Sequence, residues 1–200
     1  MKLSVAILIS GSGSNMVQLV KSMGSKHPAF PSIVISNKKE VSGLEKAQKL
    51  GVPTKVIDQN YIKNNSLNFE AELLKILKEY NVNIICLAGF MKILSKQFIE
   101  NYIDRILNIH PSLLPKYRGL NTHARALASN DLTAGCSVHL VTPELDAGPV
   151  LGQAEVLIGK NETVESLEAK ILIQEHILYP KVLFKFSNQI RESQIGRAHV

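Results

Sequence analysis

The chain has 200 residues, and its 23 Lys and Arg against 17 Asp and Glu give a net charge of +6. Hydrophobic residues make up 45% of the sequence and charged residues 20%, which excludes strong disorder and is enough for the core of one domain. The lysines are scattered, and no basic run carries interleaved aromatic residues. We therefore expect small anionic molecules, and not nucleic acid, as partners.

The N-terminal run after Lys2 resembles a short signal peptide, but no small-x-small cleavage site follows it. We interpret it as a first buried strand, and no stretch of the sequence approaches the length of a membrane span. Cys86 and Cys136 belong to no Cys-x-x-Cys pair, which argues against a zinc site and a thioredoxin-type motif. Cys86 is expected to be an inert core thiol in a cytoplasmic protein.

Short apolar runs alternate with amphipathic segments along the chain. The runs predict strands at residues 3–9, 32–36, 53–57, 83–88, 106–109, 137–141 and 150–158. The amphipathic segments predict helices at residues 15–23, 42–50, 67–80 and 164–185, the last interrupted near Pro180. This order predicts a single α/β, Rossmann-like domain. We expect a mostly parallel twisted sheet, helices on both faces and an antiparallel C-terminal part.

A glycine-rich loop, residues 9–15, lies between the first strand and the first helix and reads Ile-Ser-Gly-Ser-Gly-Ser-Asn. Gly13 lets the backbone approach an anion, and the free N–H groups of the following helix favour a phosphate. The dinucleotide fingerprint is incomplete, because Met16 stands at its last glycine position, and no Gly-Lys-Ser/Thr follows. The alternative is a tight turn with Ser14 or Asn15 as the helix N-cap.

Asn108 and His110 lie two residues apart at the end of a predicted strand, so their side chains point the same way. The first offers an amide donor, and the second changes its protonation near neutral pH. Together they indicate a site where negative charge develops on an oxygen and a proton moves.

Asp146 lies in a loop after a later strand, where α/β folds carry their functional residues. A carboxylate near His110 would favour the imidazolium and raise the pKa of His110. The alternative is a turn-forming aspartate, since sequence spacing does not show that the two residues meet. The spacing of His110, His123 and His139 fits no zinc pattern, so we expect no metal.

From Leu3 to about Phe186 the chain resembles the folate-dependent formyltransferase family, and within it the phosphoribosylglycinamide formyltransferases. The matching motifs are residues 9–15 (Ile-Ser-Gly-Ser-Gly-Ser-Asn), 87–94 (Leu-Ala-Gly-Phe-Met-Lys-Ile-Leu), 108–115 (Asn-Ile-His-Pro-Ser-Leu-Leu-Pro), 137–139 (Ser-Val-His), 145–149 (Leu-Asp-Ala-Gly-Pro) and 174–176 (Gln-Glu-His). The resemblance implies transfer of a formyl group from 10-formyltetrahydrofolate to glycinamide ribonucleotide, a step of purine biosynthesis in one-carbon metabolism, without a metal.

The resemblance also implies roles for individual residues. Asn108, His110 and Asp146 match the catalytic residues. Gly13, Ser14, Asn15 and Glu175 match the binding site of the phosphate and the ribonucleotide. Met91, Lys92, Ile93, Leu94, Asn108 and Val141 match the folate site. Gly89, Pro111, Pro115, Ser137 and His139 match supporting positions, with Pro115 as a cis proline.

Three departures from the family pattern concern affinity. Lys92 stands where Arg is common, and this change loses the bidentate fork. Ser66 stands where some relatives have Arg near the folate tail, and Lys63 is a candidate substitute. Leu172 occupies a position that is polar in relatives, one turn before Glu175.

Two relatives share the catalytic core and are less favoured here. Methionyl-tRNA formyltransferase adds an RNA-binding domain, for which this chain is too short, and formyltetrahydrofolate deformylase adds an N-terminal regulatory domain. A nucleotide-sensing module without catalysis is a third alternative. We expect small-molecule substrates, no nucleic acid and no membrane partner, a monomer or weak homodimer, and a cytoplasmic location.

The last residues form a separate segment. Residues 194–200, Gln-Ile-Gly-Arg-Ala-His-Val, match the in-frame translation of a common sequencing adapter. We expect a formyltransferase domain at residues 1–193 and a non-native tail at 194–200, with the natural C-terminus missing.

Overall fold

One mixed sheet organises the part of the chain that the computed structural model describes, residues 2–58, 62 and 68–197 (side chains to residue 193). Its strands are β1 (Leu3–Ile9), β2 (Ala29–Ser36), β3 (Thr54–Val56), β4 (Ile84–Leu87), β5 (Ile106–His110), β6 (Thr133–Leu140) and β7 (Val150–Leu157). Their order is β3-β2-β1-β4-β5-β6-β7. Strands β1 to β5 pair in parallel, whereas β6 and β7 are antiparallel. The predicted fold class is confirmed.

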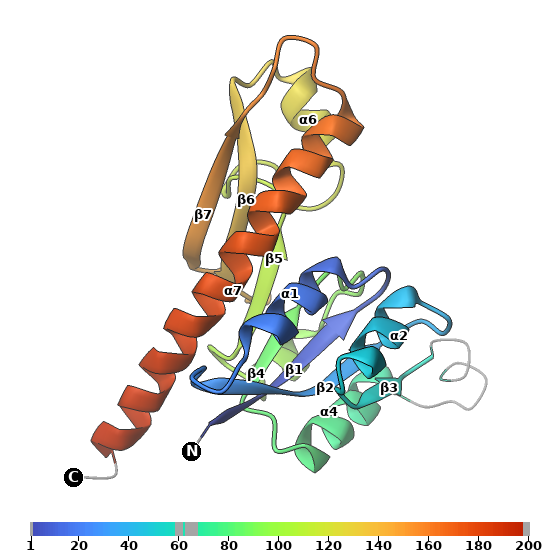
Figure 1. The fold of residues 1–200 in the computed structure, drawn as a ribbon, viewed down its shortest axis with the longest axis vertical. Coiled ribbons are helices and arrows are strands. Elements are labelled where there is room, and N and C mark those ends of the chain that lie inside the picture. The colour runs from blue at the N-terminus through green and yellow to red at the C-terminus, as the bar shows by residue number, and fades with distance from the viewer. Residues whose placement is uncertain (1, 59–61, 63–67, 198–200) are drawn as a thin grey trace.

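Helices cover both faces of the sheet (Figure 1). They are α1 (Ser14–Ser22), α2 (Ser42–Lys49), α4 (Phe69–Glu79), α5 (Lys96–Glu100), α6 (Thr122–Ala128) and α7 (Val164–Arg197). Alternate residues of β1 serve two cores: Val5 and Ile7 pack in a cluster with α1 and α7, and Ala6 and Leu8 in a cluster with α4 and α5. This explains the continuous apolar pattern of the parallel strands.

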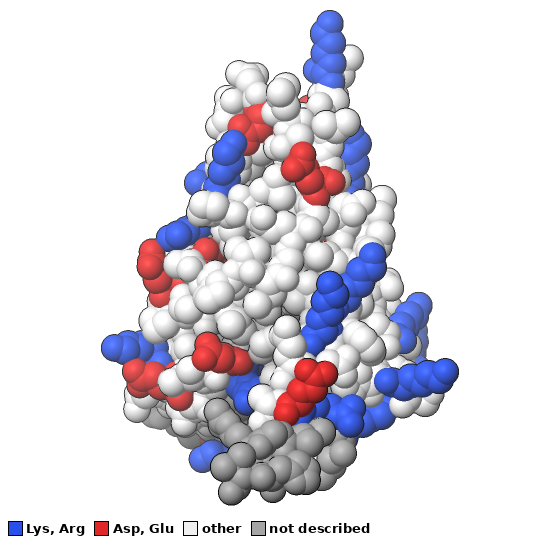
Figure 2. Space-filling view, turned by 90° about the vertical axis from the view of Figure 1, so that its left-hand side faces the viewer, with Lys and Arg blue, Asp and Glu red and all other residues white. Residues whose placement is uncertain are grey.

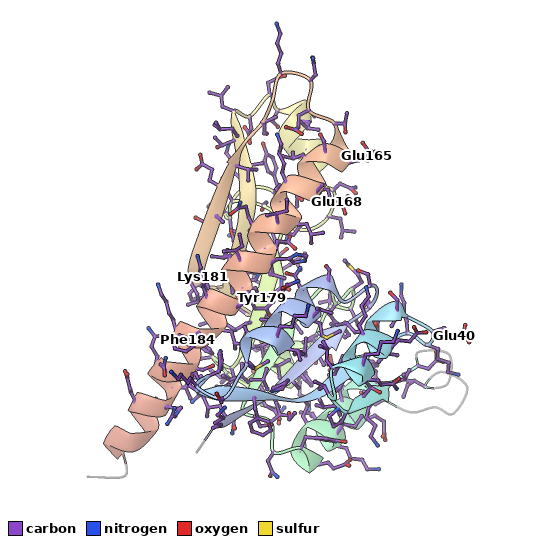
Figure 3. The ribbon with its side chains drawn as sticks, viewed as in Figure 1. Glu40, Glu165, Glu168, Tyr179, Lys181 and Phe184 are labelled. Carbon is purple, nitrogen blue, oxygen red and sulfur yellow. The ribbon has the colours of Figure 1, made fainter. Side chains whose placement is uncertain are left out.

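Helix α7 differs from the prediction. It runs without a break from Val164 to Arg197 through Pro180, so the predicted interruption is wrong. Buried side chains flank the proline, with Tyr179 and Leu183 fully enclosed, and this packing offsets the hydrogen bond that proline removes. The Tyr179 hydroxyl also donates to the carbonyls of Leu87 (3.2 Å) and Leu107 (3.0 Å), which fastens α7 to β4 and β5 (Figure 3).

The short helices α5 and α6 were not predicted. With five and seven residues, they are too short for a clear amphipathic pattern. The Ser95 hydroxyl caps α5 by accepting from the Phe98 N–H at 3.1 Å. Strand β6 also begins earlier than predicted, at Thr133.

The strand register places the ends of three strands side by side. Leu8 of β1 pairs with Leu87 of β4, which pairs with Asn108 of β5. The loops after β1 and β5 are therefore separated by two strand spacings, about 10 Å. Antiparallel pairing then sets His139 of β6 opposite Asn108.

The distribution of surface charge and the composition of the helices indicate which partners are possible. On the side of the molecule shown in Figure 2, Lys and Arg side chains are mixed with Asp and Glu on the left, and several Lys and Arg side chains lie on the right. Among the helices of the described residues, none is long and apolar enough to cross a membrane.

Candidate active site

Four polar side chains meet where β5 and β6 pair. His110 Nδ1 lies 3.4 Å from one carboxylate oxygen of Asp146, and His139 Nε2 lies 3.5 Å from the other. Asn108 Nδ2 is 3.2 Å from His139 Nε2. The structure thus brings Asn108, His110 and Asp146 together, and His139 is the link between Asn108 and Asp146.

The tautomer of neutral His139 follows from its second contact. His139 Nδ1 lies 2.8 Å from the Leu140 carbonyl, which accepts a hydrogen bond only from a protonated nitrogen. In the neutral ring Nε2 is then an acceptor for one N–H of the Asn108 amide, and only the protonated ring donates from Nε2 to Asp146. Since an amide nitrogen carries two N–H groups, Asn108 keeps one donor for a ligand.

The loop after β5 encloses the other side of His110. His110 Nε2 lies 2.9 Å from the Tyr117 carbonyl, and the Gly119 N–H donates to Asp146 at 2.9 Å. The Leu114–Pro115 peptide is cis, as predicted. These contacts fix the imidazole between a carboxylate and a carbonyl.

Two hydrogen bonds of Ser137 hold the start of this loop. Its hydroxyl donates to the Ser112 carbonyl at 2.7 Å and accepts from the Leu114 N–H at 3.0 Å. Pro111 directly precedes these contacts. Ser137 lies opposite His110 in the β5–β6 pairing, so its hydroxyl connects β6 to the turn that follows the imidazole.

The pKa of His110 is set mainly by burial of the ring. Burial lowers the pKa of His110 below its ordinary value, and this outweighs Asp146 and the Tyr117 carbonyl, which both raise it. Asp146 therefore acts in the expected direction, but the net shift of the His110 pKa is downward. Burial alone would raise the pKa of Asp146, but His139, the Gly119 N–H and His110 hold it below its usual range.

The glycine-rich loop depends on a close approach between Gly13 and α2. Gly13 is the N-cap of α1, with φ of 68°, so the alternative with Ser14 or Asn15 as the cap is wrong. A Cβ on Gly13 would lie 2.9 Å from the Cα of Gly43 in α2. Only glycine fits this position without strain.

Asn15 and Glu175 are joined beside this loop. The Asn15 Nδ2 donates to a Glu175 carboxylate oxygen at 2.7 Å, and both side chains are buried. Burial raises the pKa of Glu175, while the bond from Asn15 opposes this increase. The Asn15 Oδ1 is buried without a hydrogen-bond partner. A buried acceptor of this kind is completed at lowest cost by a donor from a ligand.

The segment after β4 lies between the glycine-rich loop and the cluster of Asn108, His110 and Asp146. The Ser10 N–H donates to the Gly89 carbonyl at 3.1 Å, and the Met91 N–H donates to the Ser10 hydroxyl at 2.8 Å. Met91 is 70% exposed and Ile93 75% exposed. Two apolar side chains left open at a site suit an apolar ligand face.

Other predicted folate residues are less exposed. Leu94 is buried, and the Lys92 ammonium lies 4.9 Å from the centre of the Phe69 ring. The Val141 N–H donates to the Ile106 carbonyl at 2.9 Å, which places the loop at residues 141–146 beside β5. Lys63 and Ser66 lie outside the described residues.

Asn108, His110, His139 and Asp146 do not line the cavity next to the loop after β5. A space of about 290 Å³ lies behind the loop after β5, next to Tyr117, His123 and Ile171. Among the described residues, no group of three or more His, Cys, Asp or Glu side chains is arranged to hold a metal ion. Cys86 is a buried free thiol, as predicted, and burial raises its pKa to about 12.

Sequence reasoning missed residues that act through the backbone or through packing. The Tyr117 carbonyl and the Gly119 N–H leave no trace in side-chain chemistry. Gly43 did leave a signal, because a glycine within a predicted helix often marks a close approach.

The fold and the motifs define a class of protein. A family model described as formyl transferase matches residues 3–183, and the chain belongs to this family. It is 39% identical to the phosphoribosylglycinamide formyltransferase of Escherichia coli over 187 residues, which cover 93% of this chain and 88% of that protein. The crystal structure of phosphoribosylglycinamide formyltransferase from Brucella melitensis has a TM-score of 0.87 and 45% identity, covering 94% of this chain and 96% of that one.

Longer relatives contain the same unit. The trifunctional purine biosynthetic protein adenosine-3 of Bos taurus is 41% identical over 200 residues, which cover 98% of this chain and 20% of that protein. The chain thus spans about a fifth of the length of that relative. The resemblance inferred from the motifs is confirmed.

Proposed function

We propose that this chain transfers the formyl group of 10-formyltetrahydrofolate to the amine of N1-(5-phosphoribosyl)glycinamide in purine (IMP) biosynthesis. The products are formylglycinamide ribonucleotide and tetrahydrofolate. The observation that carries the proposal is the cluster of Asn108, His110 and Asp146, which lies about 10 Å, two strand spacings, from a glycine-rich loop suited to a phosphate. Similarity along nearly the whole Escherichia coli enzyme supports the choice of substrates.

The reaction needs one proton to move between two nitrogens. The substrate amine attacks the formyl carbon, a C–N bond forms, and the carbonyl electrons move to the oxygen. The free N–H of Asn108 donates to this oxyanion, and the Nε2–H of His110 joins it once the ring carries the proton of the amine. When the carbonyl forms again, the bond to the folate nitrogen breaks. The amine has then lost a proton and the folate nitrogen has gained one.

The low pKa of His110 suits the transfer of this proton. With its N–H on Nδ1, facing Asp146, a neutral imidazole accepts the proton of the attacking amine at Nε2, and Asp146 stabilises the imidazolium that forms. The imidazolium then donates to the leaving nitrogen. His110 Nε2 must exchange the Tyr117 carbonyl for substrate during this cycle.

Gly13, Ser14 and Asn15 bind the phosphate in this proposal, and Glu175 binds the ribonucleotide. The exposed apolar side chains of Met91 and Ile93 contact the folate, together with Lys92, Leu94, Asn108 and Val141. We also propose a cytoplasmic protein that acts as a monomer or weak homodimer, with its domain at residues 1–193 and a non-native tail at 194–200.

The proposal is tested with three acceptors and one donor. Purified protein with 10-formyltetrahydrofolate is assayed with glycinamide ribonucleotide, with initiator methionyl-tRNA and with water alone, following the release of tetrahydrofolate. We expect turnover with the ribonucleotide only. Comparable release in water alone would make the protein a deformylase, and formylation of the tRNA would make it a tRNA formyltransferase. The nucleotide sequence of the gene tests the tail, since codons unlike the adapter would reject it.

A further inference from the structure

Helix α2 packs directly on the glycine-rich loop and carries a cation to it. The Gly43 N–H donates to the Gly11 carbonyl at 3.2 Å. A Cβ on Gly43 would lie 2.6 Å from the Ile9 side chain and 2.7 Å from the Gly11 oxygen, so only glycine allows this approach. One turn later, the Lys46 ammonium donates to the Ser12 carbonyl at 2.9 Å.

The hydrogen bond from Lys46 to the Ser12 carbonyl affects the direction of the next N–H group in the loop, that of Gly13. In a trans peptide the carbonyl and the following N–H point in opposite directions. A cation fixed on the Ser12 carbonyl therefore directs the Gly13 N–H away from the Lys46 ammonium. The N–H groups at the start of α1 also lack acceptors within the helix and attract an anion. Lys46 thus restrains the Ser12–Gly13 peptide, which contributes one of the N–H groups of the anion site.

A basic hollow continues from the loop. A space of about 320 Å³ lies between α1, α2 and α7, with Lys21, Lys46 and Lys49 in its wall and no carboxylate. Ser14, the first residue of α1, is part of the same wall. His176 also lines the hollow, and burial lowers the pKa of this histidine, so the lysines supply its positive charge near neutral pH.

We propose that Lys46 is a positioning residue for the phosphate site. Its bond to Ser12 holds the Ser12–Gly13 peptide in the orientation that receives a phosphate dianion, and its charge adds to the field of the helix terminus. The identity of this phosphate, that of the ribonucleotide acceptor, rests on the function proposed above. Since Lys46 lies at the β1 end of the site, it affects binding of the acceptor and not of the folate.

Binding of ribose 5-phosphate tests the proposal without catalysis. Calorimetry is carried out with the wild-type protein and with Lys46→Met, Lys46→Arg and Lys49→Met. Lys46→Met is expected to weaken binding about 10-fold, as for loss of a hydrogen bond from a charged group. Lys46→Arg keeps a donor and the charge, and should bind within about 3-fold of wild type. Lys49→Met removes the same charge from the same hollow and should change binding by about 2-fold or less.

Kinetics then separate binding from chemistry. Lys46→Met should raise KM for glycinamide ribonucleotide by about the same factor as the binding constant, with kcat and KM for the folate unchanged. Wild-type affinity for ribose 5-phosphate in Lys46→Met would overturn the proposal. An equal loss in Lys46→Met and Lys49→Met would also overturn it, because the hollow would then act through charge alone.

The two proposals fail in different ways. If the wild-type protein binds ribose 5-phosphate in a Lys46-dependent manner but does not formylate glycinamide ribonucleotide, only the proposed function fails. If the wild-type protein does not bind ribose 5-phosphate, the role of Lys46 fails whatever the protein catalyses. Thermal unfolding of the variants shows that they fold, since Lys46 is exposed and contributes little to the core.

Discussion

The two ends of the candidate site are built differently. At the end of β1, the backbone forms the site, with Gly13 in a left-handed conformation and Gly43 packed against the loop. At the ends of β5 and β6, titratable side chains form the site, and Asp146 lies between two histidines. In the reaction proposed above, the phosphate does not change its charge, so fixed dipoles suit it. The reacting carbonyl gains charge and then loses it, and this requires groups that exchange protons.

This difference leads to separate expectations for substitutions. Changes at the β5–β6 end should lower kcat and leave the binding of a sugar phosphate intact. Changes at the β1 end should weaken binding of the phosphorylated acceptor and leave kcat intact. The following predictions test this separation.

The largest effect is expected for His110→Ala. Loss of the group that exchanges protons should lower kcat about 1000-fold, within the range for general acid–base residues. Affinity for ribose 5-phosphate should remain near that of wild type, because the loop after β1 is untouched. Steady-state kinetics and calorimetry measure the two quantities. Near-normal turnover would remove His110 from the chemistry.

Asp146→Asn should have the next largest effect. The amide keeps the size of the side chain and an acceptor for Gly119, but removes the charge that raises the pKa of His110. We expect kcat to fall about 100-fold, since the imidazolium formed during the reaction loses its partner. The kcat–pH profile should also lose its acidic limb or shift it to lower pH. An unchanged profile would show that Asp146 acts by packing alone.

The sequence predicted the pairing of Asn108 with His110 better than the meeting of both residues with Asp146. A strand that ends in Asn-x-His must present both side chains on one side, so local periodicity was sufficient for Asn108 and His110. Their meeting with Asp146 depends on the antiparallel pairing of β5 with β6, which no local pattern encodes. Family resemblance supplied that connection.

Burial was the quantity that sequence reasoning could not supply. Asp146 was expected to raise the pKa of His110, but burial of the ring lowers this pKa on balance. In the same way, Pro180 predicted a break in α7, and the buried residues on both sides maintain the helix. In both cases burial in the folded structure outweighed a rule that is valid for the local sequence.

Gly13→Ala tests the end of the site that the backbone forms. Alanine at φ of 68° costs about 1–2 kcal/mol, and its Cβ would also press on Gly43. We expect KM for glycinamide ribonucleotide to rise about 10-fold, with kcat within about 2-fold of wild type. Gly11→Ala is the matched control, because a Cβ on Gly11 meets nothing within 4 Å. Equal effects of the two changes would show that the Gly13 conformation is not what matters.

The smallest effect concerns the pH dependence of stability. Part of it should come from buried histidines far from both ends of the candidate site. His27, His110, His123 and His176 all have a pKa lowered by burial from the ordinary value of 6.5. The unfolded chain therefore binds protons more readily. The stability that these groups contribute is present above about pH 6.5 and is lost as the pH falls through their lowered pKa values. Glu175, whose pKa is raised, acts in the opposite direction as the pH rises.

His27 allows one contribution to be isolated, because it packs edge-on against Phe184 of α7 and lies outside the site (Figure 3 labels Phe184). Its Nδ1 accepts from the Ala29 N–H at 3.0 Å, and the amide oxygen of His27→Asn can take over this bond without titrating. Urea unfolding at pH 7.5 and 5.5 should show a smaller loss of stability on acidification in His27→Asn than in wild type. The difference should not exceed about 1.4 kcal/mol per pH unit, the limit for one proton. Identical losses in the two proteins would show that His27 is not linked to unfolding, and the acid sensitivity would then have to come from the histidines at or near the site.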